Sequence, residues 1–338
     1  MHSPVLSDPT HCIAPSPLDA LLRRTPLADL QSIVDAGLDR LPLPGSGRTL
    51  QRWQALAEVA ARDLALVKLF EGHTDALAIL GELGGPAAPA GSTWGTWCAE
   101  PPDARLALHE VGGTVRLSGR KAWCSGAAGV SHAVVSCWDG DGRPCLAAVA
   151  MQQPGVQVTR EGWVAVGMAD SASVDVLFDD ALAQRIGGPG DYTARPGFWQ
   201  GGAGIAACWL GGAVGIARQV RALVGASEDP YRRMHLGSID TALAPALSLL
   251  REAAACIDAE PLADAQSIAL STRLAVEVAC EAVMRHAGRA VGAGPLCRDA
   301  RFARAMADLP VYLRQGHAER DLAARGRQVA ADGFAWSL

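Results

Sequence analysis

A stretch rich in glycine and proline, GELGGPAAPAGS at residues 81–92, separates two parts of the chain with different hydrophobic periodicity. Before it, apolar residues recur at helical spacing, so that Trp53, Leu56 and Leu64 would share one face of a helix. After it, short alternating runs continue to about residue 185. Because glycine and proline end helices, the chain must combine a helical region with a separate β region.

Six runs after this linker predict β-strands joined by short turns. They are RLALHEV, TVRLSG, HAVVSCW, CLAAVAM, VQVTREGW and VDVLF. The segments between them include EVGG, WDGDGRP and QQPGV, which are typical of turns between antiparallel strands. We therefore expect a compact antiparallel barrel or sandwich of about 95 residues.

The remainder of the chain is rich in alanine and leucine and predicts four long helices. They lie near residues 197–225, 236–258, 263–290 and 298–328. Four helices of such length favour a bundle. The expected fold class is α+β with several domains: an N-terminal helical domain (1–90), a central antiparallel β-barrel (91–190) and a C-terminal four-helix bundle (191–338).

Composition narrows the classes of function. The formal net charge of -5 provides no basic surface for nucleic acid. No apolar run reaches the length of about 18 residues that a membrane-spanning helix needs. The nine cysteines include no C-x-x-C pair, and residues 1–19 lack the pattern of a secretory signal. We expect a cytoplasmic protein that binds small molecules, without a metal site.

Five motifs, taken in order, resemble the acyl-CoA dehydrogenase family. They are TWCAEP (96–101), LSGRKAWCSGAAGVSHAVV, PGVQVTREGWVAVGMADSASVDVLFDD, YRRMHLGSID and RAVGAGPLCRDAR. The resemblance covers residues 50–310, and the predicted order of helices, β domain and bundle agrees with it. It implies that FAD is held between the barrel and the bundle. It also implies a homodimer or homotetramer, because flavin sites in this family are completed across subunits.

The resemblance implies cofactor-binding roles for residues in the β region. Trp123 would offer a flat face to the flavin ring, and Ser125 a hydroxyl or an amide near it. Trp97, Cys98 and Ala99 belong to the segment that lies along the flavin. Ala99 lacks the hydroxyl found there in the family, so only its main chain is available. The residues alone also allow Trp123 to be a core side chain and Cys98 to lie in a plain strand.

Three further cofactor residues are implied in the bundle. Arg233 matches an arginine that reaches the pyrophosphate of a neighbouring subunit, where a guanidinium can form two parallel hydrogen bonds. Gly292 and Gly294 would let the backbone approach the adenosine diphosphate part closely. A surface arginine and a glycine-terminated helix are the simpler alternatives.

The catalytic carboxylate that the family uses is missing from its usual positions. In the family reaction a carboxylate removes the α-proton of an acyl thioester, while the flavin accepts the β-hydrogen as hydride. The expected position falls on Ala307, next to Asp308, and the segment before LGGAVG contains no acid. Asp308, Glu319 and His317 remain as candidates, although Asp308 could cap a turn and the HAERD segment could be a solvated helix face.

Two other residues with reactive side chains have simpler roles. His73 could line the mouth of a substrate site, but a position on the surface of a helix is the simpler expectation. Cys124 has only Lys121 as a basic neighbour in the sequence and is expected to be a small apolar filler.

Three functions follow from these observations. The first is FAD-dependent α,β-dehydrogenation of an acyl thioester such as an acyl-CoA, with electrons passed to an acceptor flavoprotein. The second is a flavin-dependent monooxygenase supplied by a flavin reductase, which needs no base for an α-proton. The third is a homologue without catalytic activity. The missing carboxylate motivates the second and the third.

Overall fold

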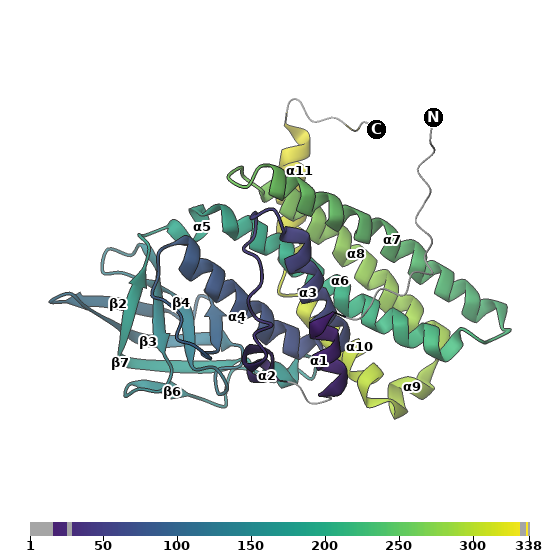
Figure 1. Cartoon of the computed structure of the whole chain (residues 1–338), viewed down its shortest axis with the longest axis horizontal. Helices are drawn as coiled ribbons and strands as arrows, with labels where there is room; N and C mark the ends of the chain where they lie inside the picture. The colour runs from purple at the N-terminus through teal and green to yellow at the C-terminus, as the bar shows by residue number, and fades with distance from the viewer. Residues whose placement is uncertain (1–15, 26–28, 332–335, 337–338) are drawn as a thin grey trace.

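The structure is a computed structural model that describes residues 16–25, 29–331 and 336. Residues 1–15, most of the segment that lacks the pattern of a secretory signal, therefore lie outside the described part. Figure 1 shows a β-barrel at one end of the molecule and a long helical bundle at the other, with an N-terminal helix lying against the barrel.

Helices form the N-terminal region, as the periodicity predicts, but the pattern around residues 51–70 spans two of them. Asp63 separates these two helices in an extended conformation, with φ -155° and ψ 122°. Its carboxylate accepts the Leu66 N–H at 2.8 Å and so caps the second helix. The region comprises α1 (Pro17–Arg24), α2 (Leu30–Asp35), α3 (Thr49–Arg62) and α4 (Leu64–Glu82).

The strands form a closed ring of pairings. The ring runs β4-β2-β3-β7-β5 and returns to β4, while β1 pairs with β4 and β6 pairs with β7. Their bounds are β1 (Trp94–Trp97), β2 (Leu106–Val111), β3 (Thr114–Cys124), β4 (His132–Trp138), β5 (Pro144–Ala150), β6 (Val156–Val158) and β7 (Val174–Ile186).

The prediction of a purely antiparallel barrel is wrong for two pairs of strands. β1 and β2 both pair with β4 in parallel. The physical reason is the connection of residues 125–131, which carries the chain away from β3 instead of forming a hairpin with it. The predicted strand VQVTREGW is also shorter than expected. It ends at Val158, and Gly162 then turns with φ 93° close against Asp175.

The C-terminal region contains three long helices and a fourth that is broken. The helix predicted over 298–328 is interrupted at residues 314–317, where the Gly316 N–H bonds to the Leu313 carbonyl at 3.0 Å. The helices are α5 (Asp191–Ala194), α6 (Pro196–Val224), α7 (Pro230–Ala259), α8 (Gln266–Val291), α9 (Ala293–Arg298), α10 (Ala300–Leu313) and α11 (Ala318–Ala330).

Helix α6 is the central element of the helical part. Its length and hydropathy would suffice to cross a membrane, but 78% of its apolar window is buried inside the protein, as in a core helix. Glycines let α3 approach it closely, since a Cβ at Gly211 or Gly215 would lie 2.4 Å or 2.5 Å from backbone oxygens of α3. One buried apolar cluster continues from these helices into the barrel. The boundaries at residues 90 and 190 remain predictions.

Candidate functional site

Trp123 lies on the outside of the barrel in a strained conformation. Its φ is 58°, and its side chain is 49% exposed, whereas the adjacent Cys124 is buried. The register between β3 and β7 shifts between Lys121 and Cys124, so that a bulge turns the indole outward. A bulky residue in the left-handed region is rare, and such strain concentrates at functional sites. This placement excludes the core position that the sequence left open.

A buried lysine ties the strand of Trp123 to the segment TWCAEP. Lys121 has no exposed side-chain surface, and its Nζ donates to Glu100 Oε1 at 2.5 Å and to the Ser136 carbonyl and hydroxyl at 2.9 Å and 2.7 Å. The Trp138 indole donates to the other Glu100 oxygen at 2.8 Å. A buried ammonium with several acceptors is stable only while those acceptors remain in place. Lys121 therefore joins β3 to the Glu100 side chain and to β4.

No sequence motif indicated this role of Lys121. The signal was present, because Val115, Leu117 and Lys121 are alternate residues of a strand and point to the same side. A charge on the inward side of a predicted strand indicates a buried partner, although its identity depends on the fold.

The structure brings the two predicted flavin segments of the barrel together. Trp97 is buried, and its indole N–H donates to the Ser125 carbonyl at 3.1 Å. Its side chain therefore supports the Ser125 turn. Cys98 is partly buried, and burial raises the pKa of its thiol to about 11, which keeps it neutral. Ala99 is exposed.

A chain of hydrogen bonds leads from Ser125 to Asp308. The Ser125 and Ser173 hydroxyls are 3.1 Å apart, and those of Ser173 and Ser171 are 2.8 Å apart. The Ser171 hydroxyl donates to the Met168 carbonyl at 2.7 Å, and the Met168 N–H donates to Asp308 Oδ1 at 2.5 Å. Asp308 thus anchors helix α10 to the barrel loop that follows β6.

Asp308 does not cap a turn of its own helix. It lies inside α10 and is 3% exposed, and burial, with a contribution from Asp63, raises the pKa of its carboxyl. One of its oxygens is occupied by the Met168 amide. This geometry makes Asp308 a structural anchor first, and its role as a base stays a proposal.

Asp308 also borders a cavity of about 340 Å³ between the N-terminal helices and the bundle. The cavity is mixed in character, with arginines, aspartates and small apolar residues in its wall. It is lined by Leu22, Thr25, Ala60, Ala61, Arg62, Asp63, Leu64, Leu66, Gly212, Gly215, Gln219, Ala300, Arg301, Arg304, Ala305 and Asp308.

The other predicted site residues lie on exposed surface. His317 and Glu319 are exposed at the beginning of α11 and do not line the cavity that Asp308 borders. Arg233 is exposed on α7 and pairs with Glu228 at 2.7 Å. Gly292 ends α8 with φ 69°, and it and Gly294 are exposed, with open space where a Cβ would lie. Their exposure is compatible with the role that the resemblance implies for Arg233, which is to contact the flavin pyrophosphate of a neighbouring subunit.

Charged residues of α4 form a polar stripe that no sequence motif indicated. Lys68, Glu71 and Asp75 lie on one face of an otherwise apolar helix, and their side chains are 17%, 13% and 16% exposed. Lys68 Nζ is 3.1 Å from Glu71 Oε2. Burial raises the pKa of the Glu71 carboxyl, and Lys68 opposes that change. Residues spaced three and four apart lie on the same face of a helix, so the sequence contained the information that places these three side chains together.

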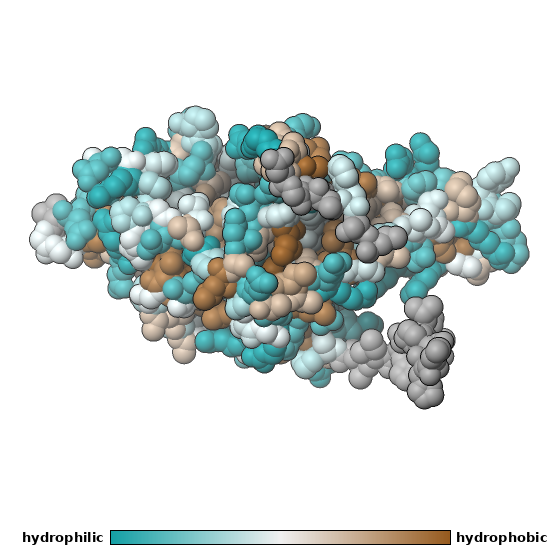
Figure 2. All heavy atoms as spheres, turned by 90° about the horizontal axis from the view of Figure 1, so that it is seen from above, coloured by the Kyte–Doolittle hydropathy of each residue, from teal (hydrophilic) through white to brown (hydrophobic). Residues whose placement is uncertain are grey.

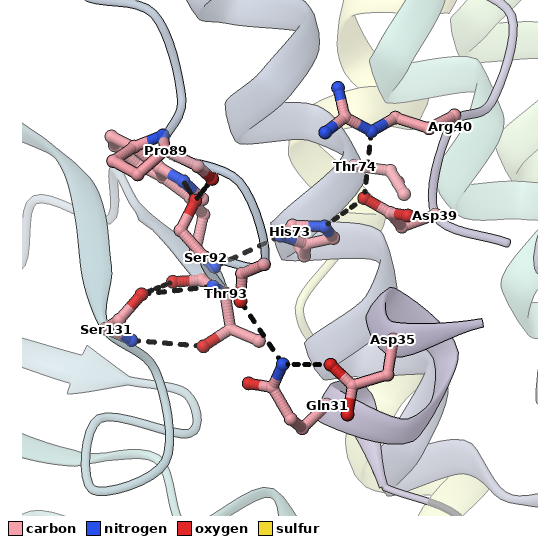
Figure 3. Close-up of polar contacts among 12 residues, drawn as sticks. Gln31, Asp35, Asp39, Arg40, His73, Thr74, Pro89, Ser92, Thr93 and Ser131 are labelled. Carbon is pink, nitrogen blue, oxygen red and sulfur yellow. Dashed lines mark hydrogen bonds and ion pairs between the residues drawn. The ribbon is translucent and has the colours of Figure 1, made fainter. Parts of the chain in front are cut away.

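His73, on the opposite face of α4, is a buried connection and not a helix-surface residue (Figure 3). It is 1% exposed, its Nδ1 accepts the Trp94 N–H at 3.1 Å, and its Nε2 is 3.2 Å from Asp39 Oδ2. Because Nδ1 accepts, Nε2 carries the proton of the neutral ring. Burial lowers the pKa of His73 more than Asp39 raises it. The imidazole joins α4, β1 and the loop after α2.

No protein-family model and no curated protein sequence matches this chain. Solved structures do. Dibenzothiophene monooxygenase TdsC from Paenibacillus sp. A11-2 matches with 20% identity and TM-score 0.79, over 94% of this chain and 96% of TdsC. Methanesulfinate monooxygenase MsuC from Pseudomonas fluorescens matches with 19% identity and TM-score 0.79, over 96% and 99%.

A third similar structure is KijD3, solved with FMN and a dTDP-linked amino sugar, at 19% identity and TM-score 0.76 over 94% of this chain and 96% of KijD3. TdsC has also been solved with FMN and indole. At these identities the likeness establishes the fold, and the chain has the acyl-CoA dehydrogenase-like fold that the sequence motifs predicted.

Proposed function

We propose that this chain is a flavin-dependent oxidoreductase, and that it acts as a monooxygenase in preference to dehydrogenating an acyl thioester. The observation that supports this preference is the hydrogen bond that occupies the Asp308 carboxylate. It is the acid beside the position where the family places its base, and its Oδ1 is held by the Met168 amide. The neighbouring position is Ala307, which has no carboxylate.

The barrel surface fits the ring system of a flavin. An isoalloxazine is flat and largely apolar, and Trp123 presents a half-exposed indole two residues before Ser125, whose carbonyl accepts the Trp97 indole N–H. Figure 2 shows hydrophobic surface toward the middle of one face of the molecule, and more hydrophilic surface at the bundle end. Trp123 would stack on the ring, and Lys121 would hold the two contacting segments in register.

Bound flavin supplies two-electron chemistry, and the chain supplies binding, orientation and exclusion of water. The sequence resemblance implies FAD, with Arg233, Gly292 and Gly294 on its diphosphate and adenosine part. TdsC and KijD3 were solved with FMN. The mass of the cofactor released from the purified protein distinguishes FMN from FAD. We further propose a homodimer or homotetramer, a cytoplasmic location and a flavin reductase as the electron donor.

The test of the function has two arms. In the first, the protein is loaded with flavin and anaerobically mixed with a panel of acyl-CoA thioesters, and bleaching of the flavin absorbance is recorded. In the second, flavin reduced by a reductase is supplied, and substrate-dependent oxygen consumption is measured. We expect activity in the second arm only. Bleaching by an acyl thioester would establish the dehydrogenase instead, and failure to bind FMN or FAD in either the oxidised or the reduced form would refute both.

A further inference from the structure

We infer that the interface of α4 and α6 beside the barrel contains a recognition site for a neutral hydroxyl group of the substrate, with Asp75 as acceptor and Arg195 as donor. This inference rests on the proposed function, because it places the substrate next to the predicted flavin. It adds a chemical class of substrate and two residues that no sequence motif indicated.

The first observation is that polar groups occupy an interface built from small residues. Gly212 faces Leu64 and Gly201 faces Asp75, so the two helices run in opposite directions along their contact. A Cβ at Gly201 would lie 3.3 Å from Asp75 Oδ1. Because glycine leaves this space open, the Asp75 carboxylate retains 16% exposure within a helix interface.

The second observation concerns the pairing of charges along the interface. Lys68 pairs with Glu71 at 3.1 Å, and Arg195 Nη1 pairs with Glu82 at 2.7 Å. Asp75 accepts no hydrogen bond from any residue that the structure describes, since the nearest cation, Arg195 Nη2, is 3.7 Å from its Oδ1. A partly buried carboxylate without hydrogen bonds is destabilising, and a bound donor would relieve it.

The third observation is an unused donor on the same guanidinium. Arg195 is 2% exposed at its side chain, and its Nε–H is buried with no partner among the described residues. One guanidinium therefore approaches Asp75 through Nη2 at 3.7 Å and also carries an Nε–H without a hydrogen-bond partner among the described residues, while Asp75 accepts no hydrogen bond from them. A hydroxyl group can donate to a carboxylate and accept from an N–H at the same time.

Charge balance favours a neutral ligand over an amine. The cationic side chains at this interface are Arg52, Lys68 and Arg195. The carboxylates are Glu71, Asp75 and Glu82. Three positive and three negative charges already cancel. Adding an ammonium would leave one uncompensated charge at a partly buried site, which is unfavourable.

The position suits a substrate of the proposed flavin. The charges of Asp75 and Arg195 both affect the pKa of the Cys98 thiol, so the three side chains lie near one another. Cys98 belongs to the segment predicted to lie along the flavin. Burial, and after it the neighbouring Cys208 and Glu71, raises the pKa of Tyr312 in α10, and the fully buried Tyr312 hydroxyl has no hydrogen-bond partner by distance and angle among the described residues. A ligand held at Asp75 would therefore lie between the barrel segment and the helices.

The experiment compares ligands that differ at one group. Calorimetry on flavin-loaded protein measures the affinity of 2-naphthol, of 2-methoxynaphthalene, which cannot donate, and of 2-naphthylmethylamine, which is cationic. We expect 2-naphthol to bind roughly tenfold or more tightly than the methoxy compound, as for a hydrogen bond to a charged group. The variant D75L should abolish this preference. Because it leaves the Arg195 guanidinium with one carboxylate fewer, its melting temperature and flavin content are measured on the same samples to show that it is folded and loaded.

The control is E71Q, which changes the neighbouring carboxylate but keeps a polar partner for Lys68 and should retain the preference for 2-naphthol. Equal binding of 2-naphthol and its methyl ether would overturn the inference and indicate that water occupies the site. If 2-naphthylmethylamine bound most tightly, the inference that the site prefers a neutral hydroxyl group would be wrong. Flavin absorbance of the same samples reports the proposed function separately, so loaded protein without the preference refutes only this inference.

Discussion

The two walls of the predicted flavin site differ in how their buried polar groups are satisfied. On the barrel side, Lys121 has three acceptors, and the hydroxyls of Ser125, Ser171 and Ser173 form a continuous chain. On the helical side, Asp75 has only an ion pair of 3.7 Å with Arg195 and accepts no hydrogen bond among the described residues. Buried N–H and O–H groups there also lack a hydrogen-bond partner among the described residues, namely those of Arg195, Trp209, Arg273 and Tyr312. A satisfied network holds one geometry, whereas unsatisfied groups are available to a ligand. We therefore expect the barrel wall to keep one geometry and the helical wall to be the one whose polar groups a substrate contacts.

The largest predicted effect tests the rigid wall. Lys121→Met removes the cation that joins Glu100 and Ser136, and should destabilise the protein by about 3 kcal/mol or more, as for one partner of a buried ion pair. Urea unfolding measures the change. Arg116→Met provides the control, because its pair with Asp180 is exposed and should contribute less than about 1 kcal/mol. Equal effects of the two substitutions would mean that the barrel wall is not specially held.

The sequence predicted the parts of this comparison that depend on local periodicity. The order of helices, strands and helices and most strand positions follow from alternation and turn residues. It did not predict the parallel pairing of β4, because that depends on where residues 125–131 place the chain. It placed Trp123 and Ser125 in one motif but gave no partner for Lys121 or His73. Those partners are 15 to 34 residues away, and only the folded chain brings them together.

The second prediction separates binding from stability on the barrel side. Trp123→Ala removes a half-exposed ring, so the free energy of unfolding should change by less than about 1 kcal/mol. Loss of the stacking face should weaken flavin binding by roughly 10- to 100-fold. Quenching of flavin fluorescence measures the affinity, and urea unfolding without flavin measures the stability. Unchanged affinity together with a large loss of stability would assign Trp123 to the core after all.

The third prediction uses the pH dependence of stability at the junction of the two walls. The folded pKa of His73 is lowered by burial, so the unfolded chain binds this proton more readily. Its stabilising contribution is therefore present above the unfolded value of about 6.5 and is lost as the pH falls toward the folded value. Each unit between the two pKa values contributes about 1.4 kcal/mol.

The measurement for His73 is urea unfolding at several pH values between 5 and 8. His73→Gln keeps an acceptor for the Trp94 N–H but cannot titrate, so its stability should fall less steeply toward pH 5 than that of the wild type. The control is His109→Gln, in the exposed hairpin of β2 and β3, which should keep the wild-type slope. If the free energy of unfolding varied with pH in the same way for all three proteins, protonation of His73 would not destabilise the folded state.

The smallest predicted effect is also a difference of sign between the walls. Tyr312→Phe removes a buried hydroxyl that has no partner among the described residues, so the stability should stay the same or rise by less than about 1 kcal/mol. Ser171→Ala removes a hydroxyl that donates to the Met168 carbonyl at 2.7 Å, and should lower the stability by about 1 kcal/mol. Both changes delete one oxygen from a fully buried site, which makes the pair well matched. If both substitutions destabilise equally in urea unfolding, a water or the Cys208 thiol beside Tyr312 satisfies its hydroxyl, and the helical wall is as complete as the barrel wall.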